Sequence, residues 1–248
     1  MHLSLGNAIL LIVGGFLGGV GNALSGGGSF LTFPLLIWLG LPPQVANATN
    51  RIAIVLQCAA GSATYHRAGV MPYRDLLRTV VPMIAGAIPG AILASRIDEG
   101  RFRIVSAILL TLMIAGLFID PKKWTRASSE GRIRPRHWVW LFLLGIYGGF
   151  LQVGSGTLVL GFLVLFAGFD VVRGNALKFG QAMVYNAVAL ALFAGVGQVD
   201  WWIGIVLAIG TMAGGAVGAT LVVRQGARWV RWAVVASAIL GVGKLLWR

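Results

Sequence analysis

Apolar residues fill most of the chain in long runs, and short polar stretches interrupt them. Ten apolar segments cover residues 4–24, 29–41, 46–65, 76–95, 104–119, 138–153, 157–169, 175–199, 201–223 and 232–247. A helix needs about 20 residues to cross the hydrocarbon core of a membrane, and the run at 201–223 contains no charged residue. This pattern predicts an all-α polytopic membrane protein with about ten transmembrane segments.

The second half of the chain repeats special residues of the first half at a shift of 128 positions. Gly28 then aligns with Gly156, Asn47-Ala48 with Asn175-Ala176, and Arg96 with Arg224. Each half also contains two pairs of glycines spaced four apart, a spacing that lets helix backbones approach closely inside a membrane. We therefore expect two five-segment repeats, at residues 1–119 and 138–248, joined by a basic linker at 120–137.

Two segments, 29–41 and 157–169, are short, and they decide how the halves are oriented. If both cross, ten spans form inverted repeats; if neither crosses, eight spans form parallel ones. With Arg51 set aside as internal to a span, ten crossings place fourteen Lys and Arg residues on one side and five on the other, whereas eight crossings divide them eleven to eight. Basic loops gather on the cytoplasmic side. The sequence thus favours inverted repeats with a cytoplasmic linker and both termini outside a bacterial plasma membrane.

Composition supports a membrane protein and excludes several other classes. The chain is 58% hydrophobic and only 11% charged, with a mean hydropathy of +0.86. Its net charge of +13 would suggest nucleic-acid binding in a soluble protein, but here the basic loops face lipid headgroups. A single cysteine, Cys58, and three widely separated histidines allow neither an internal disulfide nor a metal site. We expect no cofactor and no nucleic-acid partner.

Polar breaks interrupt the apolar pattern at matching positions of the two halves. They consist of Gly26, Gly27, Gly28 and Ser29 in the first half and of Gly154, Ser155, Gly156 and Thr157 in the second. A broken helix in each of two inverted halves indicates a transport site near the membrane midplane. The helix that starts after each break presents free N–H groups and the positive end of its dipole to an anion. The alternative is that these glycines only allow helices to pack closely.

A second polar cluster follows each short segment. It contains Asn47, Thr49, Asn50 and Arg51 in the first half and Asn175 and Lys178 in the second. Charges inside a membrane are costly, so either both cations face a cavity and attract an anion, or they extend to the headgroups while the asparagines cap helices. Six more polar residues either line the route or bond neighbouring helices: Asn22, Gln57, Gln152, Gln181, Tyr185 and Asn186.

No predicted span has a carboxylate or a histidine in its interior. Coupling to protons or sodium usually relies on an intramembrane carboxylate, so export or facilitated diffusion of an anion fits better than a cation-coupled pump. An intramembrane enzyme would need a nucleophile and base or metal ligands, and the chain offers neither within a span. A non-transporting scaffold remains the alternative to a transporter, although it leaves the repeated breaks unexplained.

The stretch GGVGNALSGGGSFLTFPLLIWLGLPPQVANATN, together with Gly69 and AGAIPGA at 85–91, resembles the TauE/SafE family of membrane permeases. The resemblance covers residues 5–245. In the second half, GSGT replaces the glycine run, no proline matches Pro34, and Lys178 stands in the place of Asn50. The resemblance implies sulfite or an organosulfonate as the substrate. A different small organic acid and a homo-oligomeric assembly both stay open.

Overall fold

The computed structural model describes residues 3–116 and 131–225, and every regular element in these ranges is a helix. In chain order these are α1 (Leu5–Ser25), α2 (Ser29–Trp38), α3 (Pro43–Arg67), α4 (Tyr73–Arg96), α5 (Glu99–Gly116), α6 (His137–Phe150), α7 (Ser155–Gly161), the π-helix η2 (Phe162–Phe166), α8 (Val171–Gly195) and α9 (Trp201–Gln225). The expected segment at 232–247, the end of the fifth segment and residues 120–130 of the linker lie outside the described residues.

Four of the described helices are long and apolar enough to cross a membrane: α1, α4, α8 and α9. Helix α3 has the same length as α8 and α9, but its first half contains the polar residues Asn47, Thr49, Asn50 and Arg51, and these are buried. Apolar side chains on the outside of the helices, such as Leu77 (70% exposed), face outward instead. The protein is therefore polar in part of its interior and apolar on its surface, which suits a lipid environment.

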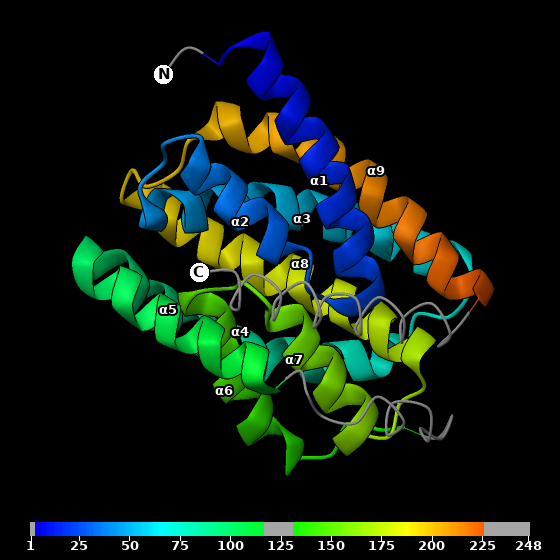
Figure 1. Cartoon of the computed structure of the whole chain (residues 1–248). Coiled ribbons are helices and arrows are strands. Elements are labelled where there is room, and N and C mark those ends of the chain that lie inside the picture. The colour runs from blue at the N-terminus through cyan, green and yellow to red at the C-terminus, as the bar shows by residue number, and fades with distance from the viewer. Residues whose placement is uncertain (1–2, 117–130, 226–248) are drawn as a thin grey trace.

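Helices α1 and α9 run side by side in the same direction (Figure 1). A Cβ atom added to Gly15 would lie 2.7 Å from the Leu207 carbonyl oxygen, and one added to Gly19 would lie 2.5 Å from that of Thr211. The residue numbers of the two helices rise together, so the helices are parallel. Only glycine allows the two backbones to come this close.

Helices α4 and α6 form an equivalent parallel pair. Gly145 lies against Met83, where an added Cβ would be 2.5 Å from the Met83 carbonyl oxygen, and Gly149 lies against Ala87 one turn later. Each parallel pair joins one helix from each half of the chain. The glycine pairs found in the sequence therefore connect the halves to each other.

Helix α3 is also parallel to α9. The Asp200 N–H donates to Thr49 Oγ1 (3.0 Å), and Thr211 Oγ1 donates to the Ala53 carbonyl (3.1 Å), so contacts advance along both helices together. Because α1 and α3 are both parallel to α9, they run in the same direction as each other. The connection between them, which contains α2, has to return across the thickness of the helical body.

Helix α8 runs antiparallel to α3. Arg51 contacts Asn186, whereas Gly61, further along α3, contacts Phe179, which comes earlier in α8. Helices α3 and α9 thus end at the face of the molecule where α4, α6 and α8 begin, and α1 runs toward the same face but stops at the first break. We call this face the arginine-rich end, because most described arginines at helix termini lie there.

Helices α3 and α8 begin earlier than the apolar pattern suggests. Pro43 occupies the first turn of α3, where its missing N–H costs nothing. Asp170 caps α8, and its Oδ1 accepts hydrogen bonds from the N–H groups of Val172 (2.9 Å) and Arg173 (3.0 Å). Each helix is therefore extended by about one turn. The polar cluster of each half lies one to two turns inside the helix, and its side chains are buried there.

Candidate functional site

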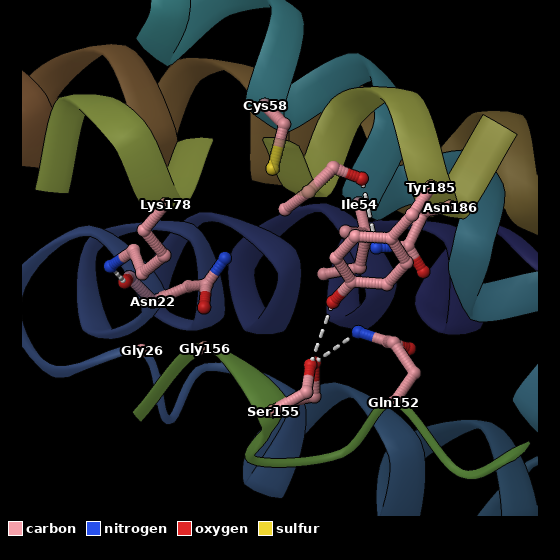
Figure 2. A pocket seen from close by; sticks show the side chains of 12 residues that line it. Asn22, Gly26, Ile54, Cys58, Gln152, Ser155, Gly156, Lys178, Tyr185 and Asn186 are labelled. Carbon is pink, nitrogen blue, oxygen red and sulfur yellow. Dashed lines mark hydrogen bonds between the residues drawn. The ribbon is translucent and has the colours of Figure 1, made fainter. Parts of the chain in front are cut away.

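The two polar breaks meet in the centre of the molecule. The first break (Gly26–Gly28) follows α1. The second was expected at Gly154–Thr157, but the chain leaves the helix earlier, at Leu151–Gly154, between α6 and α7. Gly26 and Gly154 have φ values of +78° and +74°, which glycine adopts without strain. Just after the second break, Gly156 lies so near Gly26 that an added Cβ would be 2.8 Å from the Gly26 carbonyl oxygen (Figure 2). Helix α7 begins at Ser155, two residues before the expected Thr157.

A small polar cavity lies beside this contact between the breaks. Its lining comes from both halves: Asn22, Gly26, Ser29, Ile54, Cys58, Gln152, Ser155, Gly156, Lys178, Ala182, Tyr185 and Asn186. The volume in which the centre of a water molecule can lie is about 10 Å³, which is room for about one water. A ligand of several heavy atoms needs a wider cavity than this.

Lys178 is the one charged residue among those that line the cavity. Its side chain is 2% exposed, and its ammonium nitrogen Nζ donates to the Asn22 carbonyl at 2.7 Å (Figure 2). No carboxylate is among the described lining residues. An ammonium group carries three N–H bonds, so after the bond to Asn22 it retains donors for a ligand. A buried cation without a counter-ion attracts an anion strongly in a low-dielectric site.

Hydroxyl and amide groups complete the lining. Gln152 Nε2 donates to Ser29 Oγ (2.9 Å), and Ser155 Oγ shares a hydrogen bond with the Tyr185 hydroxyl (3.0 Å). Gln152 also accepts from Asn50 Nδ2 (3.2 Å). It has a φ of +64° and is the only residue besides glycines with a positive φ in the described part of the chain. A strained backbone of this kind is typical of functional sites.

Arg51 does not line the cavity; it binds the carboxyl end of α6. Its guanidinium donates to the carbonyls of Gly148 (3.1 Å) and Gly149 (2.6 Å) and to Asn186 Oδ1 (2.9 Å). Asn47, one turn earlier in α3, donates to the Phe150 carbonyl (2.9 Å). Together the two side chains take the last three carbonyls of α6, which have no partner inside the helix. A cation at this position also stabilises the negative end of the helix dipole.

The carboxyl end of α1 is held in an equivalent way. Lys178 and the N–H of Gly26 both donate to the Asn22 carbonyl, and Thr157 Oγ1 donates to the Ser25 carbonyl (2.8 Å). Each half thus supplies a cation, from its α3 or α8, to the helix of the other half that ends at a break. The two cations differ in surroundings, because Lys178 lines the cavity and Arg51 does not.

Comparisons with known proteins identify the family of this chain. The sequence profile of the family described as Sulfite exporter TauE/SafE matches residues 11–245. The chain belongs to the TauE/SafE family. Related proteins include a "Probable membrane transporter protein" from Haemophilus influenzae, which is 26% identical over 97% of this chain and 94% of its own length. No solved structure matches.

Two further relatives of this TauE/SafE protein carry similar names. "Probable membrane transporter protein ORF9" from Sinorhizobium sp is 28% identical over 95% of this chain and 91% of its own length. "Probable membrane transporter protein YfcA" from Escherichia coli K12 is 26% identical over 93% of this chain and 86% of its own length. With the family match and the four apolar helices, they identify the protein as a multi-pass membrane transporter.

The structure divides the site residues expected from the sequence of this TauE/SafE protein into two groups. Gly26, Ser29, Ser155, Gly156 and Lys178 line the cavity. The others do not line it: Gly27, Gly28, Asn47, Thr49, Asn50, Arg51, Gly154, Thr157 and Asn175. Most of this second group bond or pack against helix ends. Asn175 is fully buried, and its amide has no hydrogen-bond partner within the described ranges.

Several lining residues were not among those expected to bind substrate. Asn22, Gln152, Tyr185 and Asn186 line the cavity, whereas Gln57 and Gln181, which look alike in the sequence, do not. All six can be recognised in the sequence because each is a polar residue inside an apolar run. Cys58 and Ile54 carry no such mark; they lie four residues apart, on the one face of α3 that meets the cavity.

We expect Gly26→Ala to destabilise the TauE/SafE protein much more than Gly69→Ala. Both glycines have a positive φ, so both substitutions strain the backbone by about 1 kcal/mol. At Gly26 the new methyl group would also collide with Gly156 and Thr157, which costs about 1–3 kcal/mol more, while at Gly69 nothing lies within 4 Å. Thermal unfolding in detergent measures both variants. Equal losses would show that the breaks do not touch.

Proposed function

We propose that this TauE/SafE protein moves a small anion, sulfite or a short organosulfonate, across the membrane by export or facilitated diffusion. The observation that carries the proposal is the buried Lys178. It lines a polar cavity where two broken helices meet, and no carboxylate is among the described residues of that lining. The family name supports a sulfur oxyanion. A membrane potential of about 100 mV, negative inside, favours export by about 2.3 kcal/mol per charge, so export needs no coupling ion.

The residues that line the cavity form the proposed binding site. Lys178 supplies the charge, and the hydroxyls of Ser29 and Ser155 donate to the oxygen atoms of the anion. Gly26 and Gly156 line the cavity where the breaks touch, and a side chain at either position would collide with the other break. The remaining members of the expected site keep the broken helix ends in place around the cavity.

The helix directions support ten crossings in inverted repeats. The parallel α1 and α3 require that α2 returns across the membrane, and the antiparallel α3 and α8 are what inversion of the halves demands. With eight crossings in parallel halves, α1 and α3 would be antiparallel, and α3 and α8 would be parallel. We therefore propose repeats at 1–119 and 138–248 around the linker at 120–137.

The distribution of arginine supports an orientation with the arginine-rich end in the cytoplasm and both termini outside. Eight described arginines lie near helix ends at that face: Arg67, Arg74, Arg78, Arg132, Arg134, Arg136, Arg173 and Arg224. Three lie at the opposite face: Arg96, Arg101 and Arg103. This asymmetry is the positive-inside pattern of a bacterial inner-membrane protein.

Flux through proteoliposomes tests the proposed transport directly. Vesicles that contain the purified protein should pass sulfite or methanesulfonate faster than protein-free vesicles of the same lipid, and an imposed potential should change the rate. A large cation such as choline serves as the control solute and should not pass. Equal flux in vesicles with and without protein, for every small anion tried, would favour the non-transporting scaffold.

The only cysteine of the chain provides an internal reporter of the site. Cys58 lines the cavity and is 1% exposed, so it reacts with N-ethylmaleimide only when the cavity opens. We expect methanesulfonate, which does not react with maleimides, to slow this labelling several-fold relative to chloride at equal ionic strength. Mass spectrometry of the intact protein measures the rate. Identical rates in the two salts would contradict a binding site at this cavity.

A further inference from the structure

A second, larger hollow lies at the arginine-rich end, between the start of α4 and the segment that precedes α6. Its volume is about 300 Å³, and Arg78, Arg132, Ile133, Arg134, Pro135 and Trp138 line it. We call it the arginine pocket. It shares no residue with the cavity at the breaks. It can therefore hold a molecule that is not the transported anion.

The backbone around the arginine pocket is held in place. The Arg132 N–H donates to the Ala167 carbonyl (3.2 Å), and the Ile133 N–H donates to Asp75 Oδ1 (3.1 Å). The Ile133 side chain is 3% exposed and packs among apolar residues that include Phe169. The arginines on either side of it thus project from a fixed segment, so binding a ligand orders little additional backbone.

Three arginines line this pocket, and none of them forms an ion pair with a carboxylate among the described residues. Within residues 3–116 and 131–225 the one ion pair joins Arg101 to Asp98 at the opposite face of the molecule. One oxygen of Asp75 accepts the hydrogen bond from the Ile133 N–H. Guanidinium groups match the geometry of phosphate oxygens and bind them in pairs of parallel hydrogen bonds. The pocket is therefore complementary to a phosphate group.

Exposed apolar side chains of α4 and α6 come next to residues that line the pocket. Trp138 lines it and is 44% exposed, which is typical of tryptophan at the membrane interface. Leu77, next to Arg78 in α4, is 70% exposed, and Val81 one turn later is 58% exposed. On α6, Val139 is 65% exposed. A ligand with acyl chains would cover this surface, whereas a free phosphate ion would not.

We propose that the arginine pocket binds the phosphate headgroup of an anionic phospholipid, with the acyl chains lying along the exposed faces of α4 and α6. Because it is separate from the cavity, this lipid site stands whether or not the cavity carries an anion. It holds the start of α4 and α6, the parallel pair whose last turns lie beside the second break.

The purified protein in detergent tests the lipid site by native mass spectrometry and thermal unfolding. Phosphatidylglycerol, phosphatidylcholine and inorganic phosphate are added separately to the wild type, to an R78Q/R132Q/R134Q variant and to a control variant, R96Q/R101Q/R103Q. We expect phosphatidylglycerol to remain bound and raise the melting temperature in the wild type and the control. The first variant should bind it about 100-fold more weakly, and R132Q or R134Q alone about fivefold more weakly.

Four results would overturn the lipid site. Equal retention of phosphatidylglycerol by the R78Q/R132Q/R134Q variant would exclude the arginines. If that triple variant does not fold, the single variants decide. Retention of phosphatidylglycerol by R132Q and by R134Q at the level of the wild type would then exclude the arginines. Equal stabilisation by phosphatidylcholine would exclude recognition of the negative headgroup. A matching shift with inorganic phosphate alone would assign the pocket to a soluble anion.

Discussion

Replacing Lys178 by methionine should lower anion flux about 10- to 100-fold while leaving the protein at least as stable as the wild type. A hydrogen bond from a charged group contributes about 1.5–3 kcal/mol to binding, and this charge is the only one among the described residues of the cavity. The Asn22 carbonyl keeps its hydrogen bond from the Gly26 N–H (2.8 Å). Removing a buried cation that has no carboxylate partner also removes its desolvation cost.

Flux in proteoliposomes and thermal unfolding in detergent, measured on the same preparation, separate these two effects. Arg96→Met is the matched control, because it removes a cation from the exposed end of α4, far from the cavity. It should leave both quantities unchanged. Wild-type flux through Lys178→Met would mean that the anion does not depend on this charge, and the proposed site would have to be abandoned.

Arg51→Met should have the opposite profile, a large loss of stability. The substitution removes three buried hydrogen bonds, to the Gly148 and Gly149 carbonyls and to Asn186 Oδ1. It leaves the last turn of α6 with unsatisfied carbonyls in a dry interior. We expect a loss of about 3–5 kcal/mol and a flux that falls in proportion to the folded fraction.

Arg51→Lys is the informative companion, because it keeps the charge but loses the planar fork that reaches two carbonyls at once. Its stability should lie between those of the wild type and Arg51→Met. Intrinsic tryptophan fluorescence during heating measures all three proteins. If Arg51→Met unfolds like the wild type but transports poorly, Arg51 belongs to the substrate path and not to the end of α6.

The breaks could be found in the sequence because glycine has a distinctive physical role. A run of glycines inside an apolar segment is costly for a continuous helix, so it signals a change of direction. The two positive φ values at Gly26 and Gly154 confirm helix ends at these positions. Their contact through Gly26 and Gly156 could not be read from the chain, since it depends on how helices from two halves pack.

The two cations show a difference that the sequence does not contain. Arg51 and Lys178 both interrupt apolar segments, and nothing in the local pattern assigns them different roles. In the structure Arg51 binds the end of α6, while Lys178 lines the cavity beside the end of α1. The difference comes from contacts between residues about 100 to 150 positions apart. The π-helical turn of η2 likewise has no signal in its apolar stretch FLVLF.

Hydropathy, charge and the properties of glycine act locally along the chain. They were therefore enough to predict from the residues alone a membrane protein whose helices break at two matching places. The contact between the breaks emerged only from the packed helices, as did the position of Lys178 rather than Arg51 at the cavity and the presence of Gln152 and Tyr185 beside it. These facts depend on which helix faces pack together, because a buried polar side chain binds whichever donor or acceptor the neighbouring helix presents.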